Sequence, residues 1–474
     1  MKHATKIVAT LGPASSSEEV LERLIEAGVN VVRLNFSHGT SAEHCARAER
    51  VRAIADRRHR DVGILVDLQG PKIRIGKFAE GAVTLRAGDA FRFDIHCEEG
   101  DQHTVGLDYK ELVNDVRQGD TLVLNDGRMT MQVESVSDSV IDARVRVGGV
   151  LSDRKGINRL GGGLSAAALT SKDMDDIRTA ASLEADFLAV SFPKHSSDMY
   201  MARELMRACG SRAHTVAKIE RFEAIGNLEE VLKASDGIMV ARGDLAIEVG
   251  DAAVPALQKR MIRLARELNK FTITATQMME SMIDSPVPTR AEVSDVANAV
   301  IDGTDAVMLS AESATGTYPV ETVESMVRIC AEAEKSHRVS LDTEVLNRTF
   351  TRIDQSIAMS ALFVAHHMQV KAIAALTQSG STALWMSRLN AGVPIYALTP
   401  EESTRRRMTI YRDVQPLLTR YEALDRDALL LACENQLIAA GVVRKGDLIA
   451  LTIGEPIGKA GGTNTLKLVR VGEH

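Results

Sequence analysis

The segment Thr215-Val216-Ala217-Lys218-Ile219-Glu220 belongs to a series of short apolar runs that decides the fold of this chain. Each run is rich in valine, isoleucine and leucine and ends on a residue that is fit for chemistry. Continuous apolar runs of this length are typical of parallel strands, which are buried on both faces. The eight runs lie at residues 6–10, 29–36, 62–67, 187–192, 215–220, 238–244, 271–277 and 306–312.

Helical patterns lie between most of these runs, for example at residues 17–27, 173–183 and 255–268. Eight alternating strand–helix units predict an α/β fold, a closed (β/α)8 TIM barrel whose chemistry lies at the carboxyl ends of the strands. Those ends carry cations, carboxylates and hydroxyls at Arg33, Asn35, Asp67, Lys218, Glu220, Arg242, Asp244, Thr276, Ser310 and Glu312. The sequence therefore predicts an enzyme with its site at one mouth of the barrel.

Two segments depart from the barrel pattern. Residues 71–165 change to alternating strands with glycine turns, and Asp126-Gly127 between two such runs predicts a hairpin. We expect an inserted, β-barrel-like lid domain at the barrel mouth, where loops carry function. The predicted division is a catalytic barrel at 1–70 and 166–340, a lid at 71–165 and an α/β effector-binding domain at 341–474.

The composition is that of an ordinary globular protein, with 45% hydrophobic and 26% charged residues among 474. A net charge of −7 argues against a nucleic-acid or anionic-membrane partner. The five cysteines are widely separated and form no Cys/His cluster, which indicates reduced thiols rather than zinc or disulfides. With no signal region and no membrane-spanning apolar stretch, we expect a cytoplasmic protein.

The sharpest chemical pattern is Lys218 followed two residues later by Glu220, because residues two apart on a strand share a face. Together they can hold a phosphate and a bridging metal, and a structural ion pair is the alternative. Asp244 can be a second carboxylate for Mg²⁺, which usually takes one or two from the protein. Gly243 permits close approach of an anion to a helix start, although a capped glycine turn has the same pattern.

Other strand ends carry further candidates. Arg33 suits bidentate recognition of an oxyanion. Thr276 and Ser310 can bind a carboxylate or relay a proton, although turns and caps use the same residue types. In the last domain, Thr377-Gln378-Ser379-Gly380-Ser381-Thr382 joins a strand to a helix. Hydroxyls and a glycine at a helix start suit a phosphate, and an N-cap cluster is equally consistent.

Nine motifs carry a resemblance to a known family, at residues 10–14, 33–39, 67–74, 155–158, 217–220, 241–245, 275–282, 288–292 and 308–312. In this order, and over essentially the whole chain, they resemble pyruvate kinase, most closely the second bacterial isoform type. The resemblance implies transfer of the phosphoryl group of phosphoenolpyruvate to ADP, giving pyruvate and ATP in the last step of glycolysis.

The resemblance also implies roles for the strand-end residues. Lys218 would stabilise the transferring phosphoryl group, and Glu220 and Asp244 would bind Mg²⁺ or Mn²⁺. Positioning and charge neutralisation are what phosphoryl transfer needs. The enolate must then be protonated, and Lys218, Thr276 and Ser310 with water are the candidates.

Substrate contacts follow from the same resemblance. Phosphoenolpyruvate would be held by Arg33, Lys218, Gly243, Asp244 and Thr276. The nucleotide would be faced by Asn35, Phe36, Ser37, His38, Arg74 and Lys155.

Lys72 marks a departure from the animal-muscle pattern of the family, in which a glutamate occupies this position beside a bound potassium ion. The stretch 68–75 resembles the potassium-independent branch instead. The Lys72 ammonium can supply the charge that potassium provides elsewhere, so we expect K⁺ not to be required. Asn35, Ser37 and Asp67 are the potential ligands of a monovalent cation.

The family places effectors in its last domain and is typically tetrameric. We therefore expect a sugar monophosphate or a nucleotide to bind at Thr377, Ser379, Ser381 and Thr382. Such a ligand would activate a homotetramer through subunit rotation.

Two other functions compete with this interpretation. Lys218 can be the nucleophile of a Schiff-base aldolase or belong to a metal-dependent lyase, but Glu220 and Asp244 beside it favour a protonated lysine. A non-catalytic metabolite sensor would use the last domain alone, and the complete catalytic set argues against it.

Overall fold

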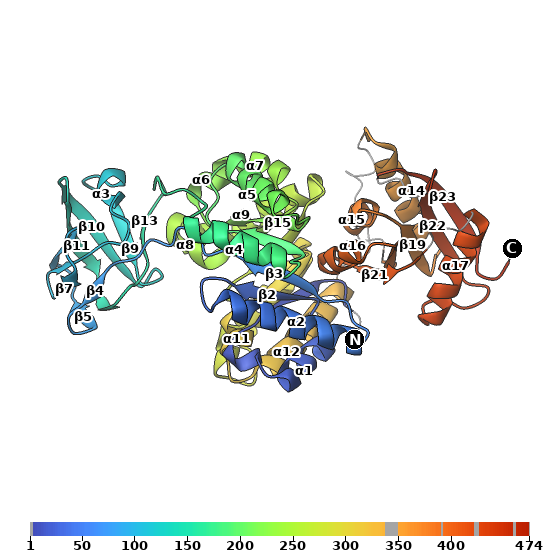
Figure 1. Cartoon of the computed structure of the whole chain (residues 1–474), viewed down its shortest axis with the longest axis horizontal. Helices are drawn as coiled ribbons and strands as arrows, with labels where there is room; N and C mark the ends of the chain where they lie inside the picture. Colours follow the sequence, from blue (N-terminus) through green and yellow to red (C-terminus); the bar gives the residue numbers. More distant parts are fainter. Residues whose placement is uncertain (1–2, 337–348, 390–391, 421–425, 458–460, 474) are drawn as a thin grey trace.

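The computed structural model describes residues 3–336, 349–389, 392–420, 426–457 and 461–473. Figure 1 shows three lobes along the long axis, with a β lobe at one end, a barrel in the centre and an α/β lobe at the other end. The β lobe and the α/β lobe therefore lie on opposite sides of the barrel.

The central lobe is a closed barrel whose neighbouring strands pair in parallel, in the order β1-β18-β17-β16-β15-β14-β3-β2. Its strands are β1 Lys6–Thr10, β2 Val31–Asn35, β3 Gly63–Asp67, β14 Phe187–Val190, β15 His214–Ile219, β16 Gly237–Ala241, β17 Phe271–Ala275 and β18 Ala306–Leu309. β1, β3, β14, β16, β17 and β18 are buried along their whole length. This burial explains the continuous apolar runs, and the predicted barrel is confirmed.

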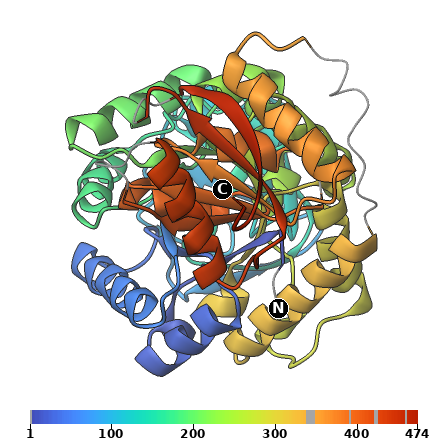
Figure 2. The same cartoon turned by 90° about the vertical axis from the view of Figure 1, so that its right-hand side faces the viewer.

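Helices surround the barrel, and Figure 2 shows them as an outer ring when it is viewed from its C-terminal-domain side. Thr40, Thr170 and Thr289 start three of them as capping boxes, each accepting the N–H of the acidic residue three positions on. The α-helices are α1 Glu18–Ala27, α2 Ser41–Arg57, α4 Ser171–Ser182, α5 Ser196–Ala208, α6 Phe222–Gly226, α7 Leu228–Ala234, α8 Arg242–Val249, α9 Val254–Glu267, α10 Arg290–Asp302, α11 Ala311–Ala314 and α12 Pro319–Ser336. Short 3-10 turns are η1 Pro13–Ser15, η2 Asp251–Ala253 and η3 Glu280–Ile283. The helices expected at 17–27, 173–183 and 255–268 are confirmed within two residues.

The inserted lobe packs its own apolar core between short sheets. Its elements are β4 Lys77–Phe78, β5 Ala82–Leu85, β6 Ala90–Asp94, β7 Glu99–Gly100, β8 Thr104–Val105, α3 Leu112–Asp115, β9 Thr121–Leu124, β10 Met129–Val136, β11 Val140–Val147, β12 Gly149–Ser152 and β13 Ile157–Arg159. The largest sheet has the order β13-β9-β10-β11-β6-β8. The predicted hairpin at Asp126-Gly127 is confirmed, because it joins β9 to antiparallel β10.

The C-terminal lobe is a five-stranded sheet in the order β21-β20-β19-β22-β23, in which β23 alone runs antiparallel to its neighbour. The elements are α14 Ile353–His367, β19 Ala372–Leu376, α15 Ser381–Ser387, β20 Ile395–Thr399, α16 Glu402–Arg407, η4 Met408–Ile410, β21 Val414–Leu418, α17 Arg426–Ala439, β22 Leu448–Gly454 and β23 Thr463–Arg470. The predicted α/β character is confirmed. The sequence patterns did not reveal β21, α16 or α17.

Two buried carboxylates fix this lobe to the amino-terminal end of the barrel strands. Asp305, just before β18, accepts hydrogen bonds from both terminal nitrogens of Arg388 and from the Arg412 N–H at 3.1 Å. Asp186, just before β14, accepts Arg406 Nε at 3.0 Å. In a TIM barrel this end serves stability, so the C-terminal lobe lies away from the mouth.

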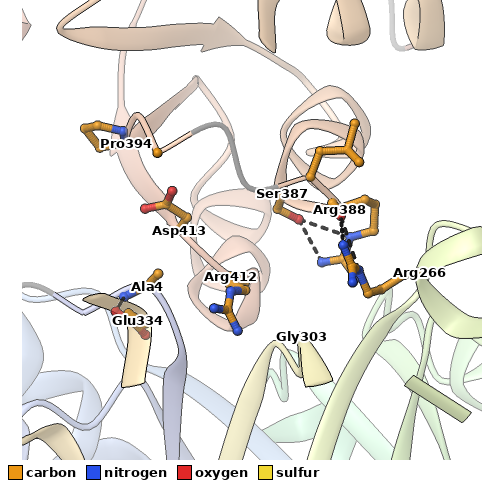
Figure 3. Close-up of a pocket in the computed structure, with 11 residues that line it drawn as sticks. Ala4, Arg266, Gly303, Glu334, Ser387, Arg388, Pro394, Arg412 and Asp413 are labelled. Atoms are coloured by element: carbon orange, nitrogen blue, oxygen red, sulfur yellow. Dashed lines mark hydrogen bonds between the residues drawn. The ribbon is translucent and has the colours of Figure 1, made fainter. Parts of the chain in front are cut away.

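A cavity of about 230 Å³ lies at this junction, and Figure 3 shows the residues around it. Glu334 in its wall accepts the backbone N–H groups of Ala4 and Thr5 at 2.9 and 2.8 Å. Burial raises the pKa of Asp413, also in the wall, to about 7. The charged lining residues are Arg266, Glu334, Arg388, Arg412 and Asp413.

Within the described part of the chain, no helix combines the length and the apolar character needed to cross a bilayer.

Candidate active site

Asp67 is the centre of the charged cluster at the barrel mouth. One carboxylate oxygen, Oδ2, accepts Arg33 Nε at 2.6 Å and lies 2.6 Å from Arg33 Nη2. The other oxygen, Oδ1, lies 3.2 Å from Lys218 Nζ. Burial by itself would raise the pKa of the Asp67 carboxyl, but Lys218 and Arg33 together hold it below its ordinary value. Asp67 is therefore an ionised anchor for two cations.

Lys218 has three partners at the end of β15. Besides Asp67, its ammonium lies 2.9 Å from Glu220 Oε1 and donates a hydrogen bond to Ser191 Oγ at 2.7 Å. The expected common face of Lys218 and Glu220 is thus confirmed. Burial by itself would lower the pKa of Lys218, but Asp67 and Glu220 raise it above its ordinary value. A protonated lysine is a phosphate ligand rather than a Schiff-base nucleophile.

Glu220 and Asp244 offer hard oxygen ligands beside this lysine. Burial raises the pKa of Glu220 to about 7, and its Oε2 accepts the Phe192 N–H at 2.9 Å. Asp244 lies in the first turn of α8 and is close enough to influence the charge of both Glu220 and Lys218. Across the described ranges no three His, Cys, Asp or Glu side chains form a ready-made metal site. Two carboxylates nevertheless fit Mg²⁺, which takes its remaining ligands from water and substrate.

Gly243 and Thr276 are joined where β16 and β17 end. Thr276 Oγ1 accepts the Gly243 N–H at 2.9 Å and donates to the Ala275 carbonyl at 2.6 Å. Thr276 has a φ of +71°, which a β-branched residue rarely adopts. The Arg242 guanidinium holds this turn by donating to the Thr276 carbonyl at 2.7 Å. The turn brings both predicted residues to the mouth.

Ser310 starts α11 at the end of β18. Its N–H donates to Glu312 Oε2 at 2.7 Å, and Glu312 Oε1 accepts the Met279 N–H at 3.2 Å. Glu312 is therefore a buried cap. The Ser310 hydroxyl has no hydrogen-bond partner in the described part of the chain and is open to solvent or ligand.

The residues expected to face the nucleotide divide into two groups. Asn35 Oδ1 accepts the Ser37 N–H at 3.1 Å, which forms a turn that leaves His38 exposed. Arg74 and Lys155 lie on the two linkers of the lid, and an Arg74–Gly156 bridge brings these linkers together. The Ile75 N–H also donates to the Lys155 carbonyl at 3.0 Å.

Phe36, in the same turn after β2, is buried. Its ring is 2% exposed and stacks on His44 with 4.2 Å between centroids. Its N–H donates to the Asp67 carbonyl, and its carbonyl accepts Lys172 Nζ at 2.8 Å. Both the ring and the backbone groups are therefore engaged within the protein, and the expectation that Phe36 faces a nucleotide stays a prediction.

In the candidate effector loop, the hydroxyls of Thr377 and Thr382 make hydrogen bonds within the domain. Thr377 Oγ1 accepts the Gly380 N–H at 2.9 Å, and the Thr382 hydroxyl pairs with Thr463 Oγ1 at 2.7 Å. Both threonines are buried, so their hydroxyls stabilise the loop, and their contact with an effector stays a prediction. Ser379 is exposed and Ser381 half-buried, with their hydroxyls 3.2 Å apart.

Ser191 and Phe192 follow β14 and contact Lys218 and Glu220, a role that the sequence patterns did not predict. The sequence did contain a signal for this role. The apolar run at 187–192 ends with the hydroxyl of Ser191, and the other barrel strands also end on polar residues. The role of Arg242 in holding the Thr276 turn was also missed.

Comparisons with known proteins agree with this geometry. Residues 2–323 match the family model described as pyruvate kinase, barrel domain, and residues 355–469 match that described as pyruvate kinase, alpha/beta domain. The chain is 50% identical to pyruvate kinase II of Salmonella typhimurium over 475 residues, with 98% of each chain covered. It is 50% identical to the pyruvate kinase of Haemophilus influenzae, with 95% of each covered. It is 47% identical to that of Buchnera aphidicola from Acyrthosiphon pisum, with 98% of each covered.

The match covers both the barrel and the C-terminal domain, and the cationic and acidic side chains meet at the barrel mouth as phosphoryl transfer requires. The chain therefore belongs to the pyruvate kinase family of phosphotransferases.

Proposed function

We propose that the chain transfers the phosphoryl group of phosphoenolpyruvate to ADP and releases pyruvate and ATP. The observation that carries this proposal is the Lys218 ammonium, which is held at the barrel mouth 3.2 Å from Asp67 and 2.9 Å from Glu220. A preorganised cation stabilises charge that develops on a transferring phosphoryl group. Membership of the pyruvate kinase family supports this reaction over an aldolase, a lyase or a metabolite sensor.

Arg33 and the Gly243–Thr276 turn would hold phosphoenolpyruvate. Arg33 uses its Nε and one terminal nitrogen on Asp67, and its Nη1 donates to Thr10 Oγ1 at 3.0 Å. A guanidinium has five N–H groups, so two remain for an oxyanion. Gly243 lies at the start of α8, where the helix dipole favours negative charge.

Glu220 and Asp244 would hold Mg²⁺ or Mn²⁺. When bound there, the ion acts as a Lewis acid that neutralises charge on the substrate oxygens. Of these two carboxylates, that of Glu220 is paired with the Lys218 ammonium at 2.9 Å in the structure without substrate.

The enolate that remains after transfer needs a proton at carbon. Lys218, Thr276 and Ser310 with water are the candidates for this step. The raised pKa of Lys218 makes its ammonium a poor proton donor. Together with the Ser310 hydroxyl, which has no hydrogen-bond partner among the described residues, this favours delivery from a water at Ser310 over delivery from Lys218.

The nucleotide would lie between the turn at residues 35–38, which includes Phe36, and the lid linkers that carry Arg74 and Lys155. Arg74 Nη1 donates a hydrogen bond to the Arg154 carbonyl at 3.0 Å. Its other N–H groups would be available to a phosphate. Lid closure over this region would exclude water from the transfer.

Potassium would not be required. Both oxygens of Asp67 are already engaged by Arg33 and Lys218, so a monovalent cation would have to compete with two resident cations. Lys72 is exposed on the lid linker two residues before Arg74, where its charge is available to a phosphate.

A sugar monophosphate or a nucleotide would activate a homotetramer through the C-terminal domain. The exposed hydroxyl of Ser379 and the half-buried hydroxyl of Ser381 support a phosphate contact at this loop. Asp305, just before β18, accepts hydrogen bonds from Arg388 and Arg412 of the C-terminal domain. These contacts connect the proposed effector domain directly to the barrel.

The test is a coupled assay of ATP formation from phosphoenolpyruvate and ADP with Mg²⁺, with and without candidate effectors. We expect turnover that depends on both substrates and on the divalent ion. Borohydride trapping of pyruvate on Lys218 without ATP formation would instead show Schiff-base chemistry and overturn the proposal.

A further inference from the structure

We infer that Ser191 and Phe192 are positioning residues for the phosphoryl-transfer centre, with Ser191 orienting the Lys218 ammonium and Phe192 orienting the Glu220 carboxylate. The inference rests on the roles proposed above for Lys218 and Glu220. It concerns the end of β14, the strand end to which the family resemblance assigned no function.

Ser191 lies in a fixed hydrogen-bond chain. It is 1% exposed, its Oγ accepts Lys218 Nζ at 2.7 Å, and its own hydrogen goes to the Leu68 carbonyl at 2.7 Å. Because the hydroxyl hydrogen is committed to Leu68, a lone pair on the oxygen is directed at the lysine. Ser191 Oγ is therefore oriented to accept a hydrogen bond from Lys218.

Lys218 has three ammonium hydrogens and three acceptors, Asp67, Glu220 and Ser191. Two of these acceptors are charged, and they dominate the electrostatic stabilisation of the ammonium. Ser191 is neutral, so it contributes direction rather than charge balance. Without it, the two carboxylates alone would set the position of Nζ.

Phe192 adopts a φ of +55°, which is a genuine outlier for a bulky residue and is typical of functional sites. In this conformation its N–H donates to Glu220 Oε2 at 2.9 Å. The Arg221 guanidinium lies 5.5 Å from the centre of the Phe192 ring, a cation–π contact that helps to hold the residue. The backbone strain therefore directs a donor onto a proposed metal ligand.

Gly70 provides independent evidence that the surroundings are shaped for this dipeptide. A Cβ at Gly70 would lie 2.8 Å from Ser191 Cβ and 3.0 Å from the Phe192 ring. Gly70 also has a φ of +65°, so both its lack of a side chain and its conformation allow Ser191 and Phe192 to pack beside it. The segment after β3 and the segment after β14 are thus fitted to each other.

The first experiment compares Ser191→Ala, Ser191→Thr and Ser313→Ala. Ser313 is the matched control, because it is also buried at the mouth and donates its hydroxyl to a backbone carbonyl, that of Thr10 at 2.9 Å. We expect Ser191→Ala to lower kcat about 10–100-fold, the usual cost of losing a residue that orients a functional group, with KM for phosphoenolpyruvate changed less than threefold. Ser191→Thr should recover most of kcat, and Ser313→Ala should remain near wild type.

The second experiment compares Phe192→Val with Phe192→Gly and measures Mn²⁺ binding by electron paramagnetic resonance in the absence of substrates. Valine disfavours positive φ and would turn the N–H away from Glu220, whereas glycine retains both φ and N–H. We expect Phe192→Val to weaken Mn²⁺ binding about 10–100-fold. Phe192→Gly should bind within threefold of wild type.

The outcomes separate this inference from the proposed function. If Lys218→Met is inactive but Ser191→Ala retains kcat within twofold, the positioning role is overturned and the role of Lys218 stands. Equal loss of Mn²⁺ affinity in Phe192→Val and Phe192→Gly would show that the ring, not the N–H, matters, and would overturn the role given to Phe192. If Lys218→Met itself retains near-normal kcat, the proposed role of Lys218 fails first.

Discussion

Arg33 closes a two-point ion pair on a single oxygen of Asp67, with its Nε and Nη2 both 2.6 Å from Oδ2. This arrangement leaves the second oxygen of Asp67 for Lys218 at 3.2 Å. One buried carboxylate thus sets the spacing between the guanidinium expected to bind substrate and the ammonium expected to stabilise the transferring group. The two cations approach each other because Asp67 offsets their repulsion.

Lys218→Met should lower kcat about 10²–10³-fold, since one preorganised electrostatic contact is usually worth that factor. The fold and phosphoenolpyruvate binding should be largely retained, because the lost interaction is strongest in the transition state. Steady-state kinetics and the thermal midpoint test this. Lys233→Met, an exposed lysine paired with Glu229 on α7, is the control. A Lys218→Met enzyme with near-normal kcat contradicts the assignment.

Replacing potassium by tetramethylammonium at equal ionic strength should leave the rate nearly unchanged, because we expect the Lys72 ammonium to supply the charge that potassium provides in other members of the family. Lys72→Glu should create a dependence on potassium. Lys77→Glu makes the same charge change at another exposed lysine of the lid and should not create one. A wild-type rate that collapses without potassium refutes the prediction.

Ser379→Glu combined with Ser381→Glu should abolish activation by a sugar monophosphate or nucleotide and leave the unactivated rate nearly unchanged. The added carboxylates repel a phosphate at the loop. Glucose 6-phosphate, ribose 5-phosphate and AMP are the compounds to test, and activation is measured as a lower half-saturating phosphoenolpyruvate concentration. By linkage, phosphoenolpyruvate should tighten effector binding to the wild type by the same factor.

The control for this double variant is Ser137→Glu with Ser139→Glu, two lid serines with the same spacing and the same added charge. Activation should persist in the control. If it also persists in the Ser379 and Ser381 variant, the effector binds elsewhere.

His214 should make stability depend on pH. Burial lowers its pKa from 6.5 to about 4, and its Nδ1 is buried with no hydrogen-bond partner in the described part of the chain. Between these values the unfolded chain binds the extra proton, so stability is full above pH 6.5 and falls as the pH drops toward 4. The limiting slope is about 1.4 kcal/mol per pH unit.

His214→Gln should flatten this dependence, measured as urea midpoints between pH 4 and 7, while His96→Gln at an exposed lid position should not. Equal pH profiles for wild type and His214→Gln would rule out this contribution.

Asp305→Asn should destabilise the junction of the barrel and the C-terminal domain by about 3–5 kcal/mol, because it leaves Arg388 buried without its counter-charge. Asp305 is fully buried. Asp175→Asn, which breaks the exposed pair with Arg178, should cost no more than about 1 kcal/mol. Thermal and denaturant unfolding measure the stability of both variants. Similar unfolding midpoints for the two would contradict the structural role of the contact between Asp305 and Arg388.

Much of the fold was predictable because its signals are local. Strands buried on both faces of a barrel must be apolar throughout, and a strand followed by a helix repeats this signal eight times. The hairpin at Asp126-Gly127 was equally predictable, since a tight turn needs residues that tolerate positive φ. Strand β21 was not predicted, because Gln415 and Pro416 interrupt its apolar pattern.

The sequence by itself determined the barrel, the polar residues at its strand ends, and the common face of Lys218 and Glu220, because strand periodicity and chain direction are local properties. Only the tertiary structure decided which partners these residues have. In the folded chain Ser191 accepts a hydrogen bond from Lys218, and the two oxygens of Asp67 bind Arg33 and Lys218. Phe36 stacks on His44, and Thr382 pairs with Thr463. Such contacts depend on strand register, rotamers and loop conformation. These are settled when distant segments pack together, and no short stretch of sequence encodes them.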